Sequence, residues 1–274
     1  MKEEEIRKAV REGYARIAKP HSSCCAPVTS CCGSADAALI SKKMGYTEKE
    51  LQAVPEGANL GLGCGNPTAL ASLKEGEAVL DLGSGAGFDC FLAANKVGKT
   101  GKVIGVDMTP EMIEKARENA KKGNYSNVEF RLGEIENIPA ADNSLDAVIS
   151  NCVINLSPNK RSVFGEAFRA LKPGGRLMVS DIVLLKELPA SIKNSLEAYV
   201  SCIPGAMIRE EYLRTIESVG FKEVRIVDET VFPLDPASNT PSAKAVFQNP
   251  ELQMEDIEKI EKSIVSIKVN AIKP

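Results

Sequence analysis

Residues Val79-Leu-Asp-Leu-Gly-Ser-Gly-Ala-Gly87 decide the fold. A short apolar run ends in Asp81, glycines follow at alternate positions, and Phe88 opens a stretch that has the pattern of an apolar-faced helix. This order predicts a strand, a tight turn and a helix. Glycines are needed in such a turn because the backbone bends sharply and approaches a ligand with no Cβ in the way. By itself the pattern also fits a glycine-rich turn that binds nothing.

Later strands favour a binding site, because they too end in polar groups. Val103-Ile-Gly-Val-Asp107 ends in an acid where a ribose-binding carboxylate belongs. We expect strands at 78–82, 103–107, 127–132, 145–150 and 176–182, and helices at about 88–96, 110–122 and 160–171. Leu171-Lys-Pro-Gly-Gly175 reads as a helix stop and turn. The alternation predicts an α/β, Rossmann-like, doubly wound and mostly parallel sheet.

Ligands of such sheets bind outside the carboxyl ends of the strands. The residues expected to face one crevice there are Asp81 to Gly87, Asp107, Met108, Glu134, Ile135, Asn151, Cys152 and Asp181.

The flanking segments differ in character from this repeat. Residues 3–18 read as an amphipathic helix docked on the body, 19–36 as a loop, and 47–53 as a short helix. After Leu184 we expect helices at 188–201 and 209–219 that cap the crevice, strands at 224–228 and 264–272 that complete a seven-stranded sheet, and a helical segment at 251–262. We therefore divide the chain into a helix with an arm (1–65), a cofactor domain (66–184) and a cap with the final strands (185–274).

Composition excludes several classes of protein. A net charge of -3 and a pI near 5.5 over 274 residues argue against nucleic-acid binding by bulk electrostatics. No apolar run approaches the roughly 20 residues that cross a bilayer, and Met1-Lys-Glu-Glu-Glu5 lacks the apolar core of a signal peptide. We expect a cytoplasmic monomer. A single histidine, His21, nearly excludes a Ser-His-Asp triad or a histidine-based zinc site.

The eight cysteines are more than packing requires. In a reducing compartment they indicate metal, metalloid or redox chemistry rather than structural disulfides. Four lie in the loop as Cys24/Cys25 and Cys31/Cys32, a spacing that does not fit a zinc ribbon or knuckle. Cys64 lies on a glycine-rich loop, where we do not expect core packing, whereas Cys90 falls inside a predicted helix and is expected in the core. For Cys152 and Cys202 a purely structural use stays open.

Four motifs between about 77 and 184 resemble the motif series of class I S-adenosylmethionine-dependent methyltransferases. They are Val-Leu-Asp-Leu-Gly-Ser-Gly-Ala-Gly, Val-Ile-Gly-Val-Asp-Met-Thr, Gly-Glu-Ile-Glu-Asn-Ile-Pro and Leu-Lys-Pro-Gly-Gly-Arg-Leu. Within that superfamily, Asn-Leu-Gly-Leu-Gly-Cys-Gly-Asn-Pro, Ile-Ser-Asn-Cys-Val-Ile-Asn-Leu and Ser-Cys-Ile-Pro-Gly-Ala resemble the arsenite methyltransferases. The second resemblance spans nearly the whole chain.

The resemblance implies S-adenosylmethionine as cofactor and a set of roles. The cofactor residues it implies are Asp81, Gly83, Ser84, Gly85, Gly87, Asp107, Met108, Glu134, Ile135 and Asn151. Cys152 and Cys202 would ligate trivalent arsenic, and Cys64 with an arm cysteine would supply further thiols. Cys32 is the arm residue chosen, over Cys31, Cys25 or Cys24.

The crevice offers no histidine as a base, although Asp181 or a tyrosine could act as one, and its cysteines favour a thiol-based chemistry. Soft thiolates select thiophilic centres, and trivalent arsenic keeps a lone pair that needs no deprotonation before it accepts a methyl group. Methylation oxidises arsenic, and a cysteine pair that becomes a disulfide can return two electrons. A thioredoxin- or glutathione-type reductant would then act, with arsenite and methylated arsenicals as substrates. Two other functions stay open, namely methylation of a small organic carbon, as in quinone or sterol synthesis, and metalloid binding without catalysis.

Overall fold

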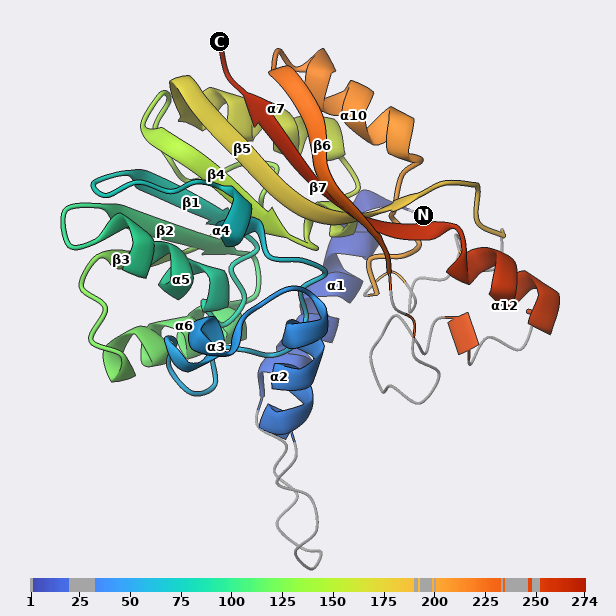
Figure 1. The fold of residues 1–274 in the computed structure, drawn as a ribbon, viewed down its shortest axis with the longest axis horizontal. Coiled ribbons are helices and arrows are strands. Elements are labelled where there is room, and N and C mark those ends of the chain that lie inside the picture. Colours follow the sequence, from blue (N-terminus) through green and yellow to red (C-terminus); the bar gives the residue numbers. More distant parts are fainter. Residues whose placement is uncertain are drawn as a thin grey trace, which may run out of the picture.

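The computed structural model describes residues 2–19, 33–189, 192, 199, 201–232, 234, 246–247 and 252–274. Within them the centre is a seven-stranded sheet in the order β3-β2-β1-β4-β5-β7-β6 (Figure 1). The strands are β1 (Ala78–Leu82), β2 (Lys102–Asp107), β3 (Val128–Leu132), β4 (Leu145–Asn151), β5 (Leu171–Leu184), β6 (Lys222–Val231) and β7 (Ile264–Ile272). The first five pair in parallel, and β7 is antiparallel to both neighbours. The predicted fold class is confirmed.

Helices cover both faces of the sheet (Figure 1). Helices α5 (Phe88–Val97) and α6 (Pro110–Lys122) pack on one face, and α7 (Lys160–Ala170) and α10 (Arg209–Ser218) on the other. Because side chains alternate along a strand, Val79 and Leu80 enter opposite layers, and both are fully buried. Burying a side chain of this size contributes about 1.5–3 kcal/mol. Two apolar layers therefore hold the carboxyl ends of the strands in fixed positions.

The N-terminal segment approaches these carboxyl ends. Helix α1 (Glu3–Ala18) has the predicted bounds, buries Ile6 and Val10, and packs against α6 and the 3-10 helix η1 (Ile154–Leu156). The remaining helices are α2 (Gly33–Lys43), α3 (Glu48–Gln52), α4 (Pro67–Leu70) and α12 (Met254–Glu261). The arm cysteines Cys24, Cys25, Cys31 and Cys32 lie outside the described residues.

The structure corrects three expectations. Residues 33–36 begin α2 rather than ending a loop, since the apolar and lysine-rich residues after them continue the helix. Strand β5 extends back to Leu171, and its pairing with β4 jumps from Leu171 to Arg176, so the predicted turn lies in that gap with Gly174 at φ 80°. Helix α10 does not cap the crevice but packs beside α7 on the sheet face. The predicted helix at 188–201 lies mostly outside the described residues.

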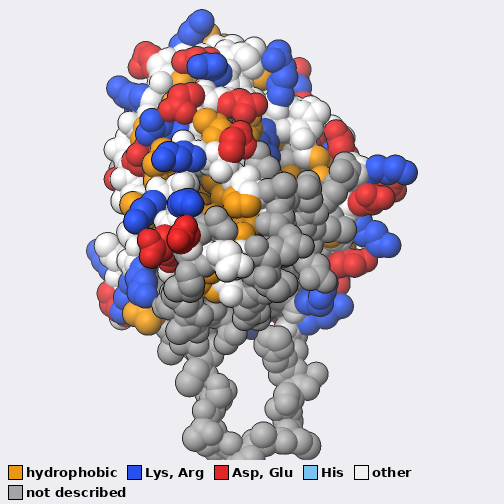
Figure 2. Space-filling view, turned by 90° about the vertical axis from the view of Figure 1, so that its right-hand side faces the viewer, with side chains coloured by type: hydrophobic (Ala, Val, Ile, Leu, Met, Phe, Trp, Pro, Cys, Tyr) orange, Lys and Arg blue, Asp and Glu red, His pale blue; other side chains and the backbone are white. Residues whose placement is uncertain are grey.

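The surface charge and the length of the helices agree with what the composition predicts. On the face shown in Figure 2, basic and acidic side chains are interspersed instead of forming one basic surface. None of the helices in the described ranges is long and apolar enough to cross a membrane.

Candidate functional site

The loop between β1 and α5 is held in a conformation that glycine adopts readily. Gly83, Gly85 and Gly87 have φ of 67°, 51° and 96°. The backbone N–H of Gly87 donates to the carbonyl of Ser84 at 2.8 Å and closes the turn. A Cβ at Gly83 would lie 2.3 Å from Val153 Cγ2, whereas a Cβ at Gly85 would meet no protein atom within 4 Å. The loop is therefore tight against the protein at Gly83 and open at Gly85.

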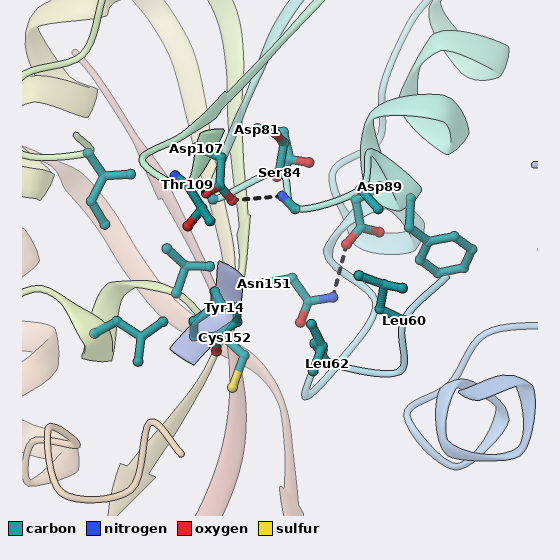
Figure 3. A pocket seen from close by; sticks show the side chains of 18 of the residues that line it. Tyr14, Leu60, Leu62, Asp81, Ser84, Asp89, Asp107, Thr109, Asn151 and Cys152 are labelled. Atoms are coloured by element: carbon teal, nitrogen blue, oxygen red, sulfur yellow. Dashed lines mark hydrogen bonds between the residues drawn. The ribbon is translucent and has the colours of Figure 1, made fainter. Parts of the chain in front are cut away.

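Asp107, at the end of β2, fixes this loop from the neighbouring strand. Its Oδ2 accepts the N–H of Gly85 and its Oδ1 the N–H of Thr109, both at 2.9 Å (Figure 3). Burial nevertheless raises the pKa of this carboxyl above its ordinary value. Each oxygen keeps acceptor capacity for a ligand hydroxyl. The acid lies where the sequence predicts a ribose-binding carboxylate.

A pocket opens beside the loop and runs toward α1. The empty volume of the pocket, which includes its mouth open to solvent, is about 1100 Å³. Lining residues that the sequence singled out are Asp81, Gly83, Ser84, Gly85, Asp107, Met108, Ile135, Asn151 and Cys152. Among the described residues, Ser84 Oγ is buried with no hydrogen-bond partner. An unpartnered hydroxyl in a glycine cradle is the feature that a polar ligand would satisfy.

Asn151, the last residue of β4, joins the pocket to the loop that carries Cys64. Its Oδ1 accepts the N–H of Cys64 at 3.0 Å, and its Nδ2 donates to the carbonyl of Gly65 at 2.8 Å. The same Nδ2 contacts Asp89 Oδ2 at 3.0 Å (Figure 3). It also contacts the Tyr46 hydroxyl at 2.8 Å. Tyr46 in turn donates to Asp89 Oδ1 at 2.6 Å. One amide thus clamps the Cys64 loop beside Cys152.

Three free thiols lie close together next to Asn151. Cys64, Cys152 and Cys202 are 3%, 6% and 3% exposed and share one apolar cluster. The Sγ atoms of Cys64 and Cys152 lie within 4.8 Å of each other, and Cys202 Sγ donates to the carbonyl of Cys152 at 3.0 Å. The expectation that Cys64 avoids core packing is therefore wrong, because its glycine-rich loop is pressed into the protein. The burial predicted for Cys90 is confirmed.

Both Cys152 and Cys202 have left-handed backbone conformations, with φ of 58° and 66°. Such a conformation costs a non-glycine residue about 1–3 kcal/mol and persists where the surroundings impose it. Two strained cysteines that meet side by side point to a use for their sulfur atoms. Cavity filling alone would require no strain.

The thiols are held in their protonated form in the free protein. Burial raises the pKa of Cys64. The hydrogen bond with Cys152 and burial raise the pKa of Cys202 well above its ordinary value. For Cys152 the contact with Cys202 lowers the pKa, but the contact with Cys64 and burial outweigh it, and the net shift is upward.

Helix α1 covers the pocket and contributes residues that the sequence did not reveal as site residues. Arg7, Val10 and Tyr14 line it. Burial, and then the neighbouring thiols of Cys202 and Cys152, raise the pKa of Tyr14 well above its ordinary value. Tyr14 belongs to the apolar stripe of α1, so its spacing indicated only docking. Tyr46 carried no signal at all.

Two implied cofactor residues lie elsewhere. Glu134 is outside the pocket lining and pairs with Arg11 at 3.4 Å and Arg7 at 3.8 Å, while Glu136 lines the pocket. The turn after β3 directs the later acid inward. Gly87 is also outside the lining and is the N-cap of α5, where a Cβ would lie 2.8 Å from Phe91 and Phe130.

A glycine-rich first turn, an acid at the end of the second strand and a pocket at the carboxyl ends define a doubly wound α/β protein that binds a nucleoside-type cofactor. The comparisons specify this class. The family model of the methyltransferase domain matches residues 73–220. An arsenite methyltransferase of Halobacterium salinarum is 49% identical over 230 residues, which is 81% of this chain and 59% of that protein. One of Mus musculus is 35% identical over 69% of this chain and 53% of its own length.

Solved structures agree with these sequence relatives. The crystal structure of an arsenic(III) S-adenosylmethionine methyltransferase from Chlamydomonas reinhardtii superposes with a TM-score of 0.65 at 31% identity, covering 90% of this chain and 75% of that one. The chain therefore belongs to the methyltransferase domain family and, within it, to the arsenite methyltransferases. It spans 53–59% of the length of the curated relatives from Halobacterium salinarum, Aquipseudomonas alcaligenes and Mus musculus.

The cofactor of this family is S-adenosylmethionine, and the site fits it. The open side of Gly85 leaves room for the backbone to contact a ligand, and Ser84 Oγ offers an unused hydrogen bond. Asp107 presents a carboxylate to hydroxyl groups, and Met108 and Ile135 offer apolar surface suited to a flat base.

Proposed function

We propose that the protein methylates trivalent arsenic held by the thiols of Cys64, Cys152 and Cys202. The observation that carries the proposal is the convergence of these buried thiols beside a cofactor pocket that Cys152 itself lines. Thiolates select soft centres, and arsenic with a lone pair is such a centre. The family membership and the two strained cysteines support the same reading.

Binding of arsenite is compatible with protonated thiols. Arsenous acid exchanges each hydroxyl for a sulfur, so one S–As bond forms, one As–OH bond breaks, and the thiol proton leaves in the released water. No thiolate needs to be stabilised beforehand, which matches the raised pKa of Cys64, Cys152 and Cys202. Two or three such exchanges hold arsenic at the floor of the pocket.

When bound, S-adenosylmethionine supplies a methyl group activated by its sulfonium. The chain must then hold arsenic about 3–3.5 Å from the methyl carbon and in line with the bond that breaks. Asp107 and the Gly83–Gly87 loop fix one partner, and Cys152 and Cys202 fix the other. Helix α1 covers the pocket with Val10 and Tyr14 and limits the access of water.

The redox balance requires a pair of thiols that can become a disulfide. Transfer of a methyl cation equivalent oxidises arsenic from the trivalent to the pentavalent state. Two thiolates that form a disulfide return two electrons to arsenic and regenerate a trivalent methylated product. We assign this step to Cys64 with an arm cysteine, Cys32 being the first choice, and the later reduction to a thioredoxin- or glutathione-type partner.

The test is incubation of the purified protein with arsenite, S-adenosylmethionine and a thiol, followed by separation of the arsenic species. We expect methylarsenicals to form in proportion to S-adenosylhomocysteine. Tight arsenite binding without a methylated product would indicate a metalloid-binding protein. Turnover with a quinone precursor but not with arsenite would indicate a carbon methyltransferase.

A further inference from the structure

Asp181 is a buried carboxyl group that arsenic methylation leaves without a role. It lies in β5, is 1% exposed, and has a carboxylate oxygen within 4.8 Å of the sulfurs of both Cys64 and Cys152. Two sulfurs and one oxygen at mutual distances of this size form a mixed donor set. Zn²⁺ takes cysteine sulfur and aspartate oxygen in tetrahedral sites.

The three donor atoms lie slightly farther apart than in a zinc site, and small side-chain movements can bring them to the required distances. In a tetrahedral site with Zn–S bonds of about 2.3 Å and Zn–O bonds of about 2.1 Å, neighbouring donors are about 3.6–3.8 Å apart. The donors here lie within 4.8 Å, so they need to approach by at most about 1.2 Å. Cys64 lies on a loop rather than in a strand, and a change of side-chain rotamer moves its sulfur by more than this.

The carboxylate is oriented as a ligand would be. Asn155 Nδ2 and the N–H of Ile182 donate to Oδ1 at 2.9 Å, and the Tyr212 hydroxyl donates to Oδ2 at 3.1 Å. Outer hydrogen bonds of this kind fix the carboxylates that bind metals. The carbonyl of Ser180 accepts from Cys64 Sγ at 3.5 Å and from the N–H of Cys152 at 2.8 Å, which ties both cysteines to β5 next to the acid.

A second observation also points to a ligand. Among the described residues, Asn155 Oδ1 is buried with no hydrogen-bond partner. Asn155 is fully buried, and its Nδ2 donates to Asp181 Oδ1. Buried polar oxygens are normally satisfied, and a bound ion or one of its water ligands would satisfy this one.

We propose that Cys64, Cys152 and Asp181 form a site for a thiophilic divalent cation, Zn²⁺ or Cd²⁺, with the fourth position taken by Cys202 or water. Binding displaces the thiol protons to solvent, and the two thiolates and the carboxylate carry one more negative charge than the divalent cation neutralises. Lys160, whose pKa burial lowers to about 8, is a nearby group that offsets this excess when it is protonated. The cation occupies the thiols that hold arsenic, so it competes with arsenite.

The cation and arsenite should differ in how much their binding depends on Asp181. Trivalent arsenic is satisfied by sulfur alone, whereas the divalent cation gains a charged oxygen donor. Asp181→Asn keeps the shape and removes the charge, and its amide oxygen can still accept from Ile182 and Asn155. The substitution should therefore lower the affinity for the cation and leave the affinity for arsenite nearly unchanged.

The experiment uses the full chain with Cys24, Cys25, Cys31 and Cys32 replaced by serine, which removes competing thiols of the arm. Cd²⁺ is titrated while the charge-transfer absorbance of its thiolate bonds is followed, with a chelator to set the free concentration. We expect one bound Cd²⁺ per chain, loss of at least tenfold in affinity with Asp181→Asn, and no loss with Asp146→Asn, a remote acid paired with Lys172. Arsenite affinity of Asp181→Asn should stay within about threefold.

Equal Cd²⁺ affinity in Asp181→Asn and Asp146→Asn would overturn the site, and so would an equal loss of Cd²⁺ and arsenite affinity. X-ray absorption of the Zn²⁺-loaded protein without the Asp181 substitution provides a readout that does not depend on a variant that folds. Two or three sulfurs with an oxygen support the site, and sulfur alone overturns it. Failure to methylate arsenite would remove the proposed function and leave the cation titration unaffected.

Discussion

Two glycine-rich loops of nearly the same composition meet at the site, and they need glycine for different reasons. In the cofactor loop, Gly83, Gly85 and Gly87 all have positive φ. In the thiol loop, residues 61–65, Gly61 alone does so, at φ 67°. There a Cβ at Gly63 would lie 2.6 Å from Asn151 Nδ2, and one at Gly65 would lie 2.7 Å from Ser180 Oγ.

The difference follows from what each loop contacts. The cofactor loop bends so that its backbone faces open space at Gly85, where a ligand can replace solvent. The thiol loop lies so close to β4 and β5 that only hydrogen atoms fit, and this closeness buries Cys64 beside Cys152. One loop is built to be contacted by a ligand, and the other to place a sulfur. Substitutions should therefore separate the two functions.

The largest expected effect falls on the thiol side. Cys152→Ser and Cys202→Ser replace a soft sulfur with a hydroxyl, so arsenite methylation should fall below detection while cofactor affinity stays within about twofold. Methylarsenicals and S-adenosylmethionine binding are measured on the same samples. Cys90→Ser is the control, because Cys90 is packed in the core and donates to Asp81 at 3.2 Å. A Cys152→Ser or Cys202→Ser variant with wild-type turnover would return that cysteine to a structural role.

The next effect should fall on the cofactor side alone. If Asp107 binds the ribose hydroxyls as we propose, Asp107→Ala removes charge-assisted hydrogen bonds of about 1.5–3 kcal/mol. Affinity for S-adenosylmethionine should fall by about tenfold to a hundredfold. Titration calorimetry measures this, and arsenite affinity of the same variant is the matched control. Unchanged cofactor affinity would remove Asp107 from the site.

A pair of alanine substitutions tests whether the cofactor loop and the thiol loop act separately. Gly63→Ala places a methyl group against Asn151, and overpacking of this kind costs about 1–3 kcal/mol, so arsenite affinity should fall by about tenfold with cofactor affinity kept. Gly85→Ala places a methyl group in the open side of the cradle, so cofactor affinity should fall by a similar factor with arsenite affinity kept. Urea unfolding of both variants corrects for lost stability. If the loss of arsenite affinity relative to the loss of cofactor affinity were the same in both variants, the two loops would act as one unit.

The sequence predicted the parts that repeat and missed those that depend on tertiary contact. Periodicity and strand ends were sufficient to predict the succession of β1 to β5 along the chain and the position of Asp107 at the end of β2, because both follow from local pattern. Tyr46 could not be found, since its contact with Asp89 joins residues 43 positions apart without any motif. Glu134 does not line the pocket whereas Glu136 does, and the turn that follows β3 makes this difference hard to read from a strand pattern. The burial of Cys64 depends on the close approach of Asn151, which glycine permits and composition does not reveal.

The smallest expected effect concerns the contact that joins the two loops. Asp89 lies in the first turn of α5, directly after the cofactor loop, and accepts from Asn151, which holds the thiol loop. Burial raises its pKa from an ordinary 3.8 to about 6, although Tyr46 and Asn151 donate to it. The folded state therefore binds its proton more tightly than the unfolded state. Its contribution to stability is complete below the ordinary pKa and is lost as the pH rises through about 6.

Asp89→Asn removes that titration. The free energy of unfolding of the wild type, minus that of the variant, should therefore decrease by up to about 3 kcal/mol between about pH 4 and pH 6. Asp81, whose pKa burial and the charge of Asp89 raise well above its ordinary value, continues the decrease at higher pH, because it ionises more easily in the variant, where residue 89 carries no charge. Urea unfolding across this range measures the difference, with a constant m-value as the check on two-state behaviour. A difference that does not change with pH over this range would contradict the raised pKa of Asp89.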